Sequence, residues 1–130
     1  MGSAQVNVEF FIFIGIVFLI SVAFGLTSVE QLKDFRNQQE SDAVKDLALK
    51  LQKELIVAAT VEDGYVRSFT IPNNLSNINF VLMTQNSTIS VQSANAFYTV
   101  SIPKIVGNLS KGTNSINKTL GVIYVNSAYP

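Results

Sequence analysis

The chain of 130 residues contains no cysteine, no histidine and no tryptophan, and it has only three prolines. Without cysteine it can have no disulfide, no thiol nucleophile and no thiolate metal ligand. Without histidine it lacks the commonest general base and a frequent metal ligand. Triads of the Ser-His-Asp and Cys-His types are therefore excluded. We predict that the chain is not an enzyme and that it holds no cofactor and no metal.

Acidic residues are missing from the second half of the chain. Residues 1–63 hold all nine acids and five bases, a net charge of −4, whereas residues 64–130 hold four bases and no acid, a net charge of +4. A paired-carboxylate site has no candidates in the second half. Four scattered cations also make a poor nucleic-acid surface, so no nucleic-acid partner is predicted. The uneven distribution is either chance or the mark of a positive part that packs on a negative one.

The longest apolar run lies at the beginning, from Gln5 to Leu26, and is almost uninterrupted from Phe10 onward. A run of about 20 apolar residues can cross the bilayer hydrocarbon as a helix. It is either a cleaved secretory signal, a plain membrane anchor, or a helix that packs beside copies of itself. The first interpretation needs a basic start and a small-residue cleavage site, and neither is evident here. Small residues within the run would let another helix approach closely: Gly15, Ser21 and Gly25.

Glu9 lies at the front edge of this run. A carboxylate beside a lipid-facing segment is costly unless it is paired or reaches water. A plain anchor gains nothing from it. In a helix that packs beside copies of itself, each carboxylate can meet a positive group on a neighbour.

The segment Gln5-Val6-Asn7-Val8-Glu9-Phe10, followed at once by the apolar run, resembles the Q-x-x-x-E-F/Y signature of archaeal type IV pilin-like proteins with class III signal peptides. The resemblance implies that a prepilin peptidase cuts between Ala4 and Gln5. Gln5 then becomes the N-terminus, and Glu9 pairs with the terminal ammonium of an adjacent subunit. The family also implies an assembly ATPase and a polytopic membrane platform as partners.

Residues 1–4 depart from the family pattern. Class III leaders normally end in a basic residue and then Gly or Ala, whereas Met1-Gly2-Ser3-Ala4 keeps the small residue and has no Lys or Arg. We interpret these four residues as a leader remnant or a cloning scar.

A single helix is predicted over residues 5–60, because no proline occurs before Pro72. Residues 5–26 form its transmembrane or filament-core part, and residues 27–60 are amphipathic, with apolar residues at helical spacing. The apolar stripe comprises Val29, Leu32, Phe35, Ala43, Leu47, Leu51 and Leu55, widened by Val44, Ala48 and Ala58. The turn signal Glu62-Asp63-Gly64 ends the helix.

Residues 61–130 are predicted to form a β-rich head. Alternating apolar and polar residues predict strands at Tyr65–Ile71 and Thr88–Gln92, and short segments bounded by turn residues predict strands at Asn79–Met83, Ala96–Ile102 and Gly121–Val125. Loops are expected at Gly107-Asn108 and Lys111–Asn114. The expected fold is α+β: a long N-terminal helix, first hydrophobic and then amphipathic, with a small antiparallel sheet packed on its C-terminal half in the manner of a type IV pilin.

Four N-x-S/T sequons occur in the head, at Asn74, Asn86, Asn108 and Asn117, each in an expected turn or strand end. Their use for N-glycosylation would place the head outside the cell. The first basic residues after the span, Lys33 and Arg36, indicate the opposite orientation by the positive-inside rule. We give the sequons the greater weight, and we expect a cell-surface protein whose precursor is inserted in the cytoplasmic membrane.

The function that these features predict is that of a structural subunit of an archaeal type IV pilus-like filament. The chain would polymerise with itself through its N-terminal helix after leader cleavage, with Gln5, Glu9 and Phe10 as assembly residues. Two alternatives remain open. One is a single-span, membrane-anchored extracellular binding module that never polymerises, and the other is a minor pilin of low copy number.

Overall fold

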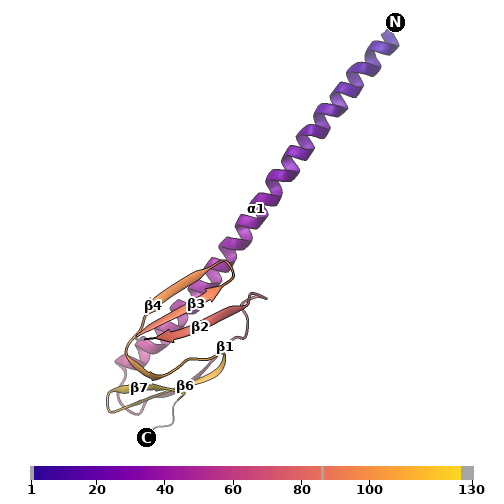
Figure 1. The fold of residues 1–130 in the computed structure, drawn as a ribbon. Helices are drawn as coiled ribbons and strands as arrows, with labels where there is room; N and C mark the ends of the chain where they lie inside the picture. The colour runs from indigo at the N-terminus through magenta and orange to yellow at the C-terminus, as the bar shows by residue number, and fades with distance from the viewer. Residues whose placement is uncertain (1, 86, 127–130) are drawn as a thin grey trace. The chain divides into compact units, whose positions relative to one another are not determined.

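A computed structural model of the chain describes residues 2–85 and 87–126. The chain divides into two compact units, Met1–Arg36 and Asn37–Pro130, and each is described by itself. The first unit contains the N-terminal part of helix α1 (Gly2–Thr60). Among its described residues, the second unit contains the C-terminal part of that helix and seven strands (Figure 1).

Helix α1 begins at Gly2, slightly before the expected start at Gln5, and ends at Thr60 as expected. As at every helix C-terminus, its last carbonyl groups have no hydrogen-bond donor within the helix. The Lys118 ammonium donates to the carbonyl oxygens of Ala59 and Val61, at 2.8 and 2.6 Å. Gly64 then takes a φ of 92°, which favours glycine, and its N–H donates to the Lys118 carbonyl at 2.8 Å. The expected turn at residues 62–64 is therefore present.

The seven strands form two sheets. A four-stranded sheet has the order β1-β6-β7-β5, and a three-stranded sheet has the order β2-β3-β4. The strands are β1 (Val66–Ile71), β2 (Phe80–Gln85), β3 (Thr88–Ser93), β4 (Phe97–Ser101), β5 (Ile105–Gly107), β6 (Gly112–Thr119) and β7 (Val122–Val125). The predicted α+β fold is confirmed, since one long N-terminal helix is followed by a small β region that packs on its C-terminal part.

The structure adds two strands that the sequence did not predict. β5 includes the expected loop residue Gly107, and β6 begins within the expected loop at Lys111–Asn114. β6 lies between β1 and β7 and is antiparallel to both, whereas β5 pairs with β7 in parallel. The region is thus divided between two sheets, one of which is mixed, instead of forming one antiparallel sheet.

One hydrophobic core joins both sheets to the helix. Its helical members recur every three or four residues and include Val44, Leu47, Leu51 and Leu55, as the periodicity predicts. The four-stranded sheet contributes Ile71, Ile116 and Val125, and the three-stranded sheet contributes Phe80, Ile89 and Val100. Because all of these side chains are nearly or fully buried, the helix from residue 44 to residue 58 and the two sheets stabilise one another.

A buried amide, Asn114, stands among these apolar side chains with all of its hydrogen-bonding capacity used. Its Nδ2 donates to the carbonyls of Ser110 and Gly112, at 2.7 and 3.0 Å. Its Oδ1 accepts from the Ser110 N–H at 2.9 Å and from the Asn126 Nδ2 at 2.7 Å. A satisfied amide of this kind holds the loop before β6 against the end of β7.

Candidate functional site

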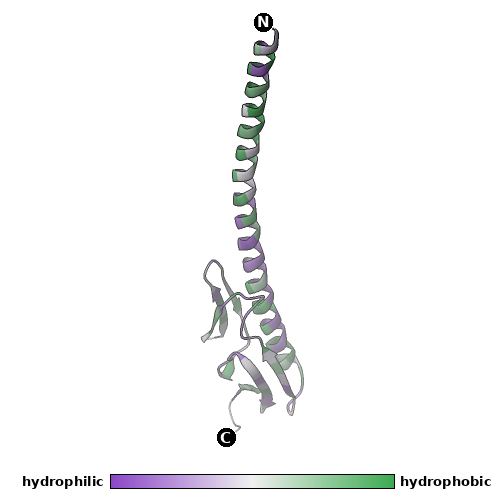
Figure 2. Cartoon of the chain, turned by 90° about the vertical axis from the view of Figure 1, so that its right-hand side faces the viewer, coloured by the Kyte–Doolittle hydropathy of each residue, from purple (hydrophilic) through white to green (hydrophobic). Residues whose placement is uncertain are grey.

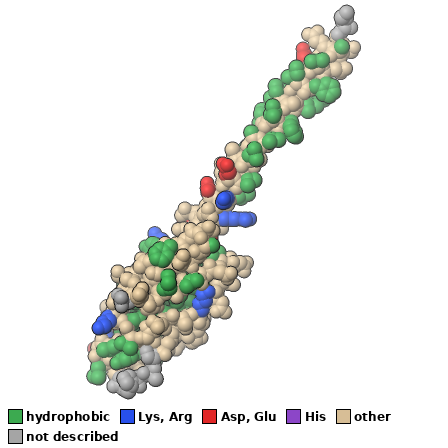
Figure 3. Space-filling view, in the orientation of Figure 1, with side chains coloured by type: hydrophobic (Ala, Val, Ile, Leu, Met, Phe, Trp, Pro, Cys, Tyr) green, Lys and Arg blue, Asp and Glu red, His purple; other side chains and the backbone are tan. Residues whose placement is uncertain are grey.

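The apolar face presented by the first unit is the most conspicuous functional feature. α1 is a helix long and apolar enough to cross a membrane, and its apolar window is 0% buried within the described chain. Every large hydrophobic side chain from Val6 to Phe35 is exposed, on all sides of the helix. Figure 2 shows the hydrophobic N-terminal part of α1 giving way to a more polar part, and Figure 3 shows hydrophobic side chains along that segment. Such a surface requires lipid or other protein around it.

Glu9 lies in this segment and is exposed. Among residues 2–85 and 87–126, its carboxylate has no hydrogen-bond or ion-pair partner. Gln5 precedes it by four residues, which is about one helical turn. Phe10 is exposed beside it and makes an edge-to-face contact with Phe11, with ring centroids 6.3 Å apart. The three expected assembly residues thus occupy neighbouring turns of one uncovered helix.

Ala4 and Gln5, the residues of the expected processing site, lie in the first turns of α1 and are exposed. The bond between them is therefore accessible to another protein.

The small residues of the apolar run have no packing role within the described part of the chain. A Cβ atom added at Gly15 or Gly25 would meet nothing within 4 Å. The hydroxyls of Ser21 and Ser28 donate to helix carbonyls one turn earlier, at 2.8 and 2.9 Å, and so need no outside partner. Glycine inside a helix costs about 1 kcal/mol relative to alanine in water. Nothing in the described chain requires that cost at these positions, whereas close helix–helix approach would.

The expected amphipathic stripe divides into a covered and an uncovered part. Its members from Val44 to Ala58 are buried by the sheets, but Val29, Leu32 and Phe35 are 66%, 61% and 61% exposed. We call residues 29–36 the collar segment. It combines these three apolar side chains with Glu30, Lys33, Asp34 and Arg36, so it is too charged for the bilayer interior.

The structure keeps the predicted glycosylation sites apart. Asn74 is exposed between β1 and β2, and Asn108 is exposed after β5. Asn117 lies within β6 and is half-buried, and its Oδ1 accepts a hydrogen bond from Thr119 at 3.2 Å. Asn86 lies outside the described residues. Asn74 and Asn108 therefore have the exposed loop setting that a glycan needs, whereas Asn117 lies near the end of a strand and is half-buried.

A polar cavity in the second unit was not predicted from the sequence. It has a volume of about 390 Å³ and is lined by Thr84, Gln85 and Ser87 at the β2–β3 turn and by Lys104, Gly107 and Asn108 around β5. We call it the Lys104 cavity. The Thr84 Oγ1 is buried and has no hydrogen-bond partner among the described residues. No pattern in the sequence brings residues 84–87 beside residues 104–108, because tertiary packing alone does so.

The described residues contain no group of three or more Asp and Glu side chains placed to hold a metal ion. Comparison of the chain with protein-family models, with curated proteins and with solved structures finds no significant match.

Proposed function

We propose that the chain is the structural subunit of an extracellular filament of the archaeal type IV pilus kind, which assembles through residues 5–26. The observation that carries the proposal is an apolar helix that is uncovered on every side and bears a single unpartnered carboxylate, Glu9, near its start. Lipid alone would cover the apolar side chains, but it offers the carboxylate nothing.

The proposed mechanism follows from the energetics of moving the helix between two apolar environments. Lipid tails are as apolar as leucine, so transfer from the membrane into a filament core brings little hydrophobic free energy. The preference of one apolar helix for another over lipid must then come from close packing and from polar pairs. Gly15 and Gly25 provide sites of close approach, since none of the residues that the structure describes occupies the space beside them.

Glu9 provides the polar pair. The resemblance to class III signal peptides implies cleavage between Ala4 and Gln5, which creates an ammonium on Gln5. That ammonium pairs with Glu9 of the next subunit, and the attraction between the two charges offsets part of the cost of desolvating them. Each copy contacts the next one through two different surfaces, one on each partner. Because such a heterologous contact does not close into a finite ring here, the chain polymerises. A prepilin peptidase, an assembly ATPase and a membrane platform would be needed for this process.

The orientation of the proposed filament rests on its head. Asn74 and Asn108 are exposed sequon asparagines, and their glycosylation would require the second unit to lie outside the cell. The proposed location is therefore the cell surface, with the precursor held in the cytoplasmic membrane by residues 5–26.

A second candidate is a single-span anchor that carries an extracellular binding module. The observation that favours it is that α1 passes the length and composition test for a membrane span without any partner. In this alternative Glu9 is dispensable. A minor pilin of low copy number is intermediate between the filament subunit and the anchored module. It would use Glu9 for assembly without forming the bulk of the filament.

The test compares Glu9→Ala with wild type in cells that export and assemble the chain. We expect Glu9→Ala to remain inserted in the membrane but to form few or no filaments, as seen by electron microscopy and in the sheared surface fraction. Glu62→Ala is the matched control, since it removes an exposed carboxylate just beyond the helix end. Mass spectrometry should find a chain that begins at Gln5 in the sheared wild-type fraction. Normal filaments from Glu9→Ala would contradict the assembly role, and a wild-type chain confined to the membrane would favour the anchored module.

A further inference from the structure

The most exposed large hydrophobic side chain in the described part of the chain lies on the second unit and not on the apolar run. Leu120 is 80% exposed, more than any large hydrophobic side chain from Val6 to Phe35. Together with Gly121 it forms the turn between β6 and β7. Single exposed leucines are common on protein surfaces, so this exposure alone indicates nothing about function.

The backbone conformation makes leucine an unusual residue for this turn. Leu120 and Gly121 have φ values of 51° and 76°, so both lie in the left-handed region, as in a type I′ hairpin turn. Asparagine, aspartate and glycine favour the first position of such a turn, whereas a bulky side chain is strained there. The hairpin therefore carries a strained leucine where asparagine would stabilise it. Strain that is kept at an exposed position points to a function for the side chain.

The hairpin is fastened to the end of α1, so the position of Leu120 is well defined. The Gly121 N–H, next to Leu120 in the chain, donates to the Asp63 Oδ1 at 2.9 Å. The Lys118 ammonium donates to the carbonyl oxygens of Ala59 and Val61. A side chain on a preordered turn costs less to immobilise than one on a mobile loop, which favours its use as a binding residue.

A mainly apolar cavity of about 400 Å³ lies in the same unit. Its lining surrounds the start of β2 and the end of β3 and comprises Asn79, Phe80, Val81, Gln92, Ser93 and Ala94. We call it the Phe80 cavity. Two groups of opposite charge contact this uncharged lining: the Lys111 ammonium lies 4.3 Å from the Phe80 ring centroid, and the Glu40 carboxylate accepts from the Ser93 hydroxyl. An apolar side chain can enter the cavity without burying a charged lining residue.

Two other cavities of the unit suit a leucine side chain less well. The Lys104 cavity is mainly polar and has a lysine in its lining. The cavity between α1 and the β1–β2 loop is lined in part by Asp46 and Lys50, which would be desolvated by an apolar occupant. Its lining also includes Asn74, where a glycan would obstruct entry. The Phe80 cavity is therefore the best match for Leu120.

The turn of the hairpin and the Phe80 cavity are far apart along α1. Asn95, which follows the cavity residue Ala94 in the chain, is bonded to Glu40, whereas Gly121 is bonded to Asp63 beyond the helix end. The helix from residue 40 to residue 60 spans about 30 Å at 1.5 Å per residue.

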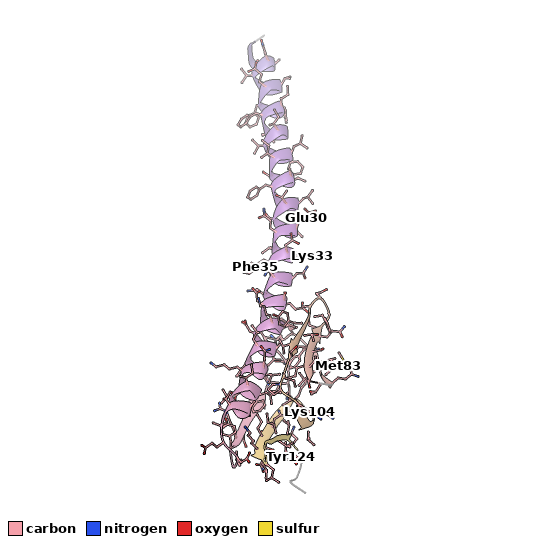
Figure 4. The ribbon with its side chains drawn as sticks, turned by 90° about the vertical axis from the view of Figure 1, so that its left-hand side faces the viewer. Glu30, Lys33, Phe35, Met83, Lys104 and Tyr124 are labelled. Carbon is pink, nitrogen blue, oxygen red and sulfur yellow. The ribbon has the colours of Figure 1, made fainter. Side chains whose placement is uncertain are left out.

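The figures show the same separation. In Figure 1 the β3–β4 turn and the β6–β7 hairpin lie at opposite ends of the strands, and in Figure 4 Tyr124 on β7 lies nearer the end of α1 than Met83 on β2. Leu120 therefore cannot reach the Phe80 cavity of its own chain, and the two can meet only between copies.

We propose that Leu120 of one copy occupies the Phe80 cavity of a second copy. The inference rests on the proposed function, which places many copies in a regular array. Because the contact joins different surfaces at opposite ends of one unit, it is heterologous and can repeat from copy to copy without closing. It is additional to the pairing of Glu9 with the terminal ammonium, and it gives the strained leucine a role.

Other exposed apolar side chains extend the contact on both sides. Val81 and Phe97 are 59% and 61% exposed, and the strand register places both opposite Gln92 of the cavity lining. Val122 is exposed directly after the hairpin turn. These side chains would be covered together with Leu120, so the buried apolar surface is larger than one side chain.

The first test replaces Leu120 by asparagine, the residue that the turn favours. We expect Leu120→Asn to raise the unfolding temperature of the full chain in detergent, because the strain is relieved. We also expect it to lower the yield of sheared filaments by about tenfold or more, because the burial of a leucine side chain is lost. Misfolding cannot produce opposite changes in stability and assembly. Val106→Thr is the matched control, since it alters an exposed apolar side chain on β5, and it should leave the filament yield unchanged.

The second test uses the absence of cysteine from the wild-type chain. Val122→Cys and Ala94→Cys are combined in one chain, filaments are sheared from cells, and a bifunctional maleimide with a short spacer is added. We expect a ladder of cross-linked oligomers on denaturing gels, because the two thiols of one chain are too far apart for the spacer. The matched control combines Val122→Cys with Lys50→Cys, which moves the second thiol to the cavity beside Asn74. Its ladder should be at least about tenfold weaker, because the spacer cannot span the two sites.

The outcomes separate this inference from the proposed function. Wild-type filament yield from Leu120→Asn would overturn the inference, and so would a ladder that is stronger with Lys50→Cys than with Ala94→Cys. Filaments of Leu120→Asn that form normally but attach less to other cells would assign the side chain to an outside partner, which also overturns it. Each of these results leaves the proposed function intact. Absence of filaments from the wild-type chain would instead overturn the proposed function.

Discussion

Arg67 on β1 and Glu54 on α1 meet through two contacts, Nε to Oε2 at 2.8 Å and Nη2 to Oε1 at 3.0 Å. The two-point geometry matches the planar guanidinium to the carboxylate. Glu54 is 15% exposed and Arg67 is 51% exposed, so solvent weakens the pair without abolishing it. We expect Arg67→Lys, which keeps the charge but loses the fork, to lower the free energy of unfolding by up to about 1 kcal/mol. Thermal unfolding of the full chain in detergent, followed by near-UV circular dichroism, measures this.

The control for this pair is Lys53→Gln, which removes an exposed cation next to Glu54 in the sequence. It should leave the unfolding temperature nearly unchanged. Equal losses from the two variants would show that general charge, and not the Arg67–Glu54 geometry, matters here.

Leu55 is 0% exposed at the centre of the contact between helix and sheets. Leu55→Ala should lower the free energy of unfolding of the second unit by about 2–5 kcal/mol, because it loses apolar burial and leaves a cavity. Leu49→Ala is the matched control, since Leu49 is 39% exposed on the same helix, and it should cost far less. Similar losses from both changes would contradict the assignment of the core face.

Glu40 holds the β3–β4 turn to the helix, and this contact depends on pH. Its carboxylate oxygens accept from the backbone N–H and the side-chain amide of Asn95, each at 3.2 Å. Hydrogen bonds from the Ser93 hydroxyl and from Asn95 lower the pKa of Glu40 from its ordinary value of 4.5. A lowered pKa means that the ionised form is favoured in the folded state. The stabilisation is therefore fully present above pH 4.5 and is lost as the pH falls through the folded-state pKa.

We expect Glu40→Gln to be less stable than wild type at pH 7, with a difference that shrinks steadily as the solution is acidified below the ordinary pKa. The measurement is the unfolding temperature of both chains across this range. A difference that stays constant with pH would show that the carboxylate charge contributes nothing.

Gly25 has open space where a side chain would stand. Gly25→Leu should leave the helix content of the detergent-solubilised chain unchanged or higher, because leucine is a better helix former. It should nevertheless reduce filament yield, since the added bulk prevents close helix approach. Val22→Leu is the control, because it changes a position that is already large. Circular dichroism and electron microscopy give the two readouts, and normal filaments from Gly25→Leu would place Gly25 away from any helix contact.

Much of the fold follows from local sequence patterns. The helix is predictable because proline is absent before Pro72 and because apolar residues recur at helical spacing from Ala43 to Leu55. β1 and β3 lie where alternation places them, and β2, β4 and β7 lie close to the short segments predicted between turn residues. β6 was missed because an inward-facing position is Asn114, whose amide is satisfied by four hydrogen bonds, so the polar sequence resembles a loop. β5 has only three residues, too few to show a pattern.

The candidate sites divide in the same way. Glu9 is recognisable in the sequence because it is a charged residue at the edge of an otherwise apolar run. The Lys104 cavity does not stand out, since Lys104 and Thr84 are ordinary surface residue types that only the folded chain brings together. The glycosylation sites remain predictions. Asn74 and Asn108 lie in exposed loops, and Asn117 lies near the end of β6.

The pairing of β1 with β6 determines when the head can form during synthesis. Ile71 pairs with Gly112 and Val66 with Asn117, so the first strand after the helix waits for nearly all of the remaining chain. The β2-β3-β4 sheet is built from consecutive strands and closes early, since local contacts form fastest. The apolar helix therefore leaves the ribosome long before the four-stranded sheet can close over its other end. A chain interrupted in translation would display a complete apolar helix without a finished head, so in the proposed filament subunit the segment that enters the membrane would be available before the head has folded.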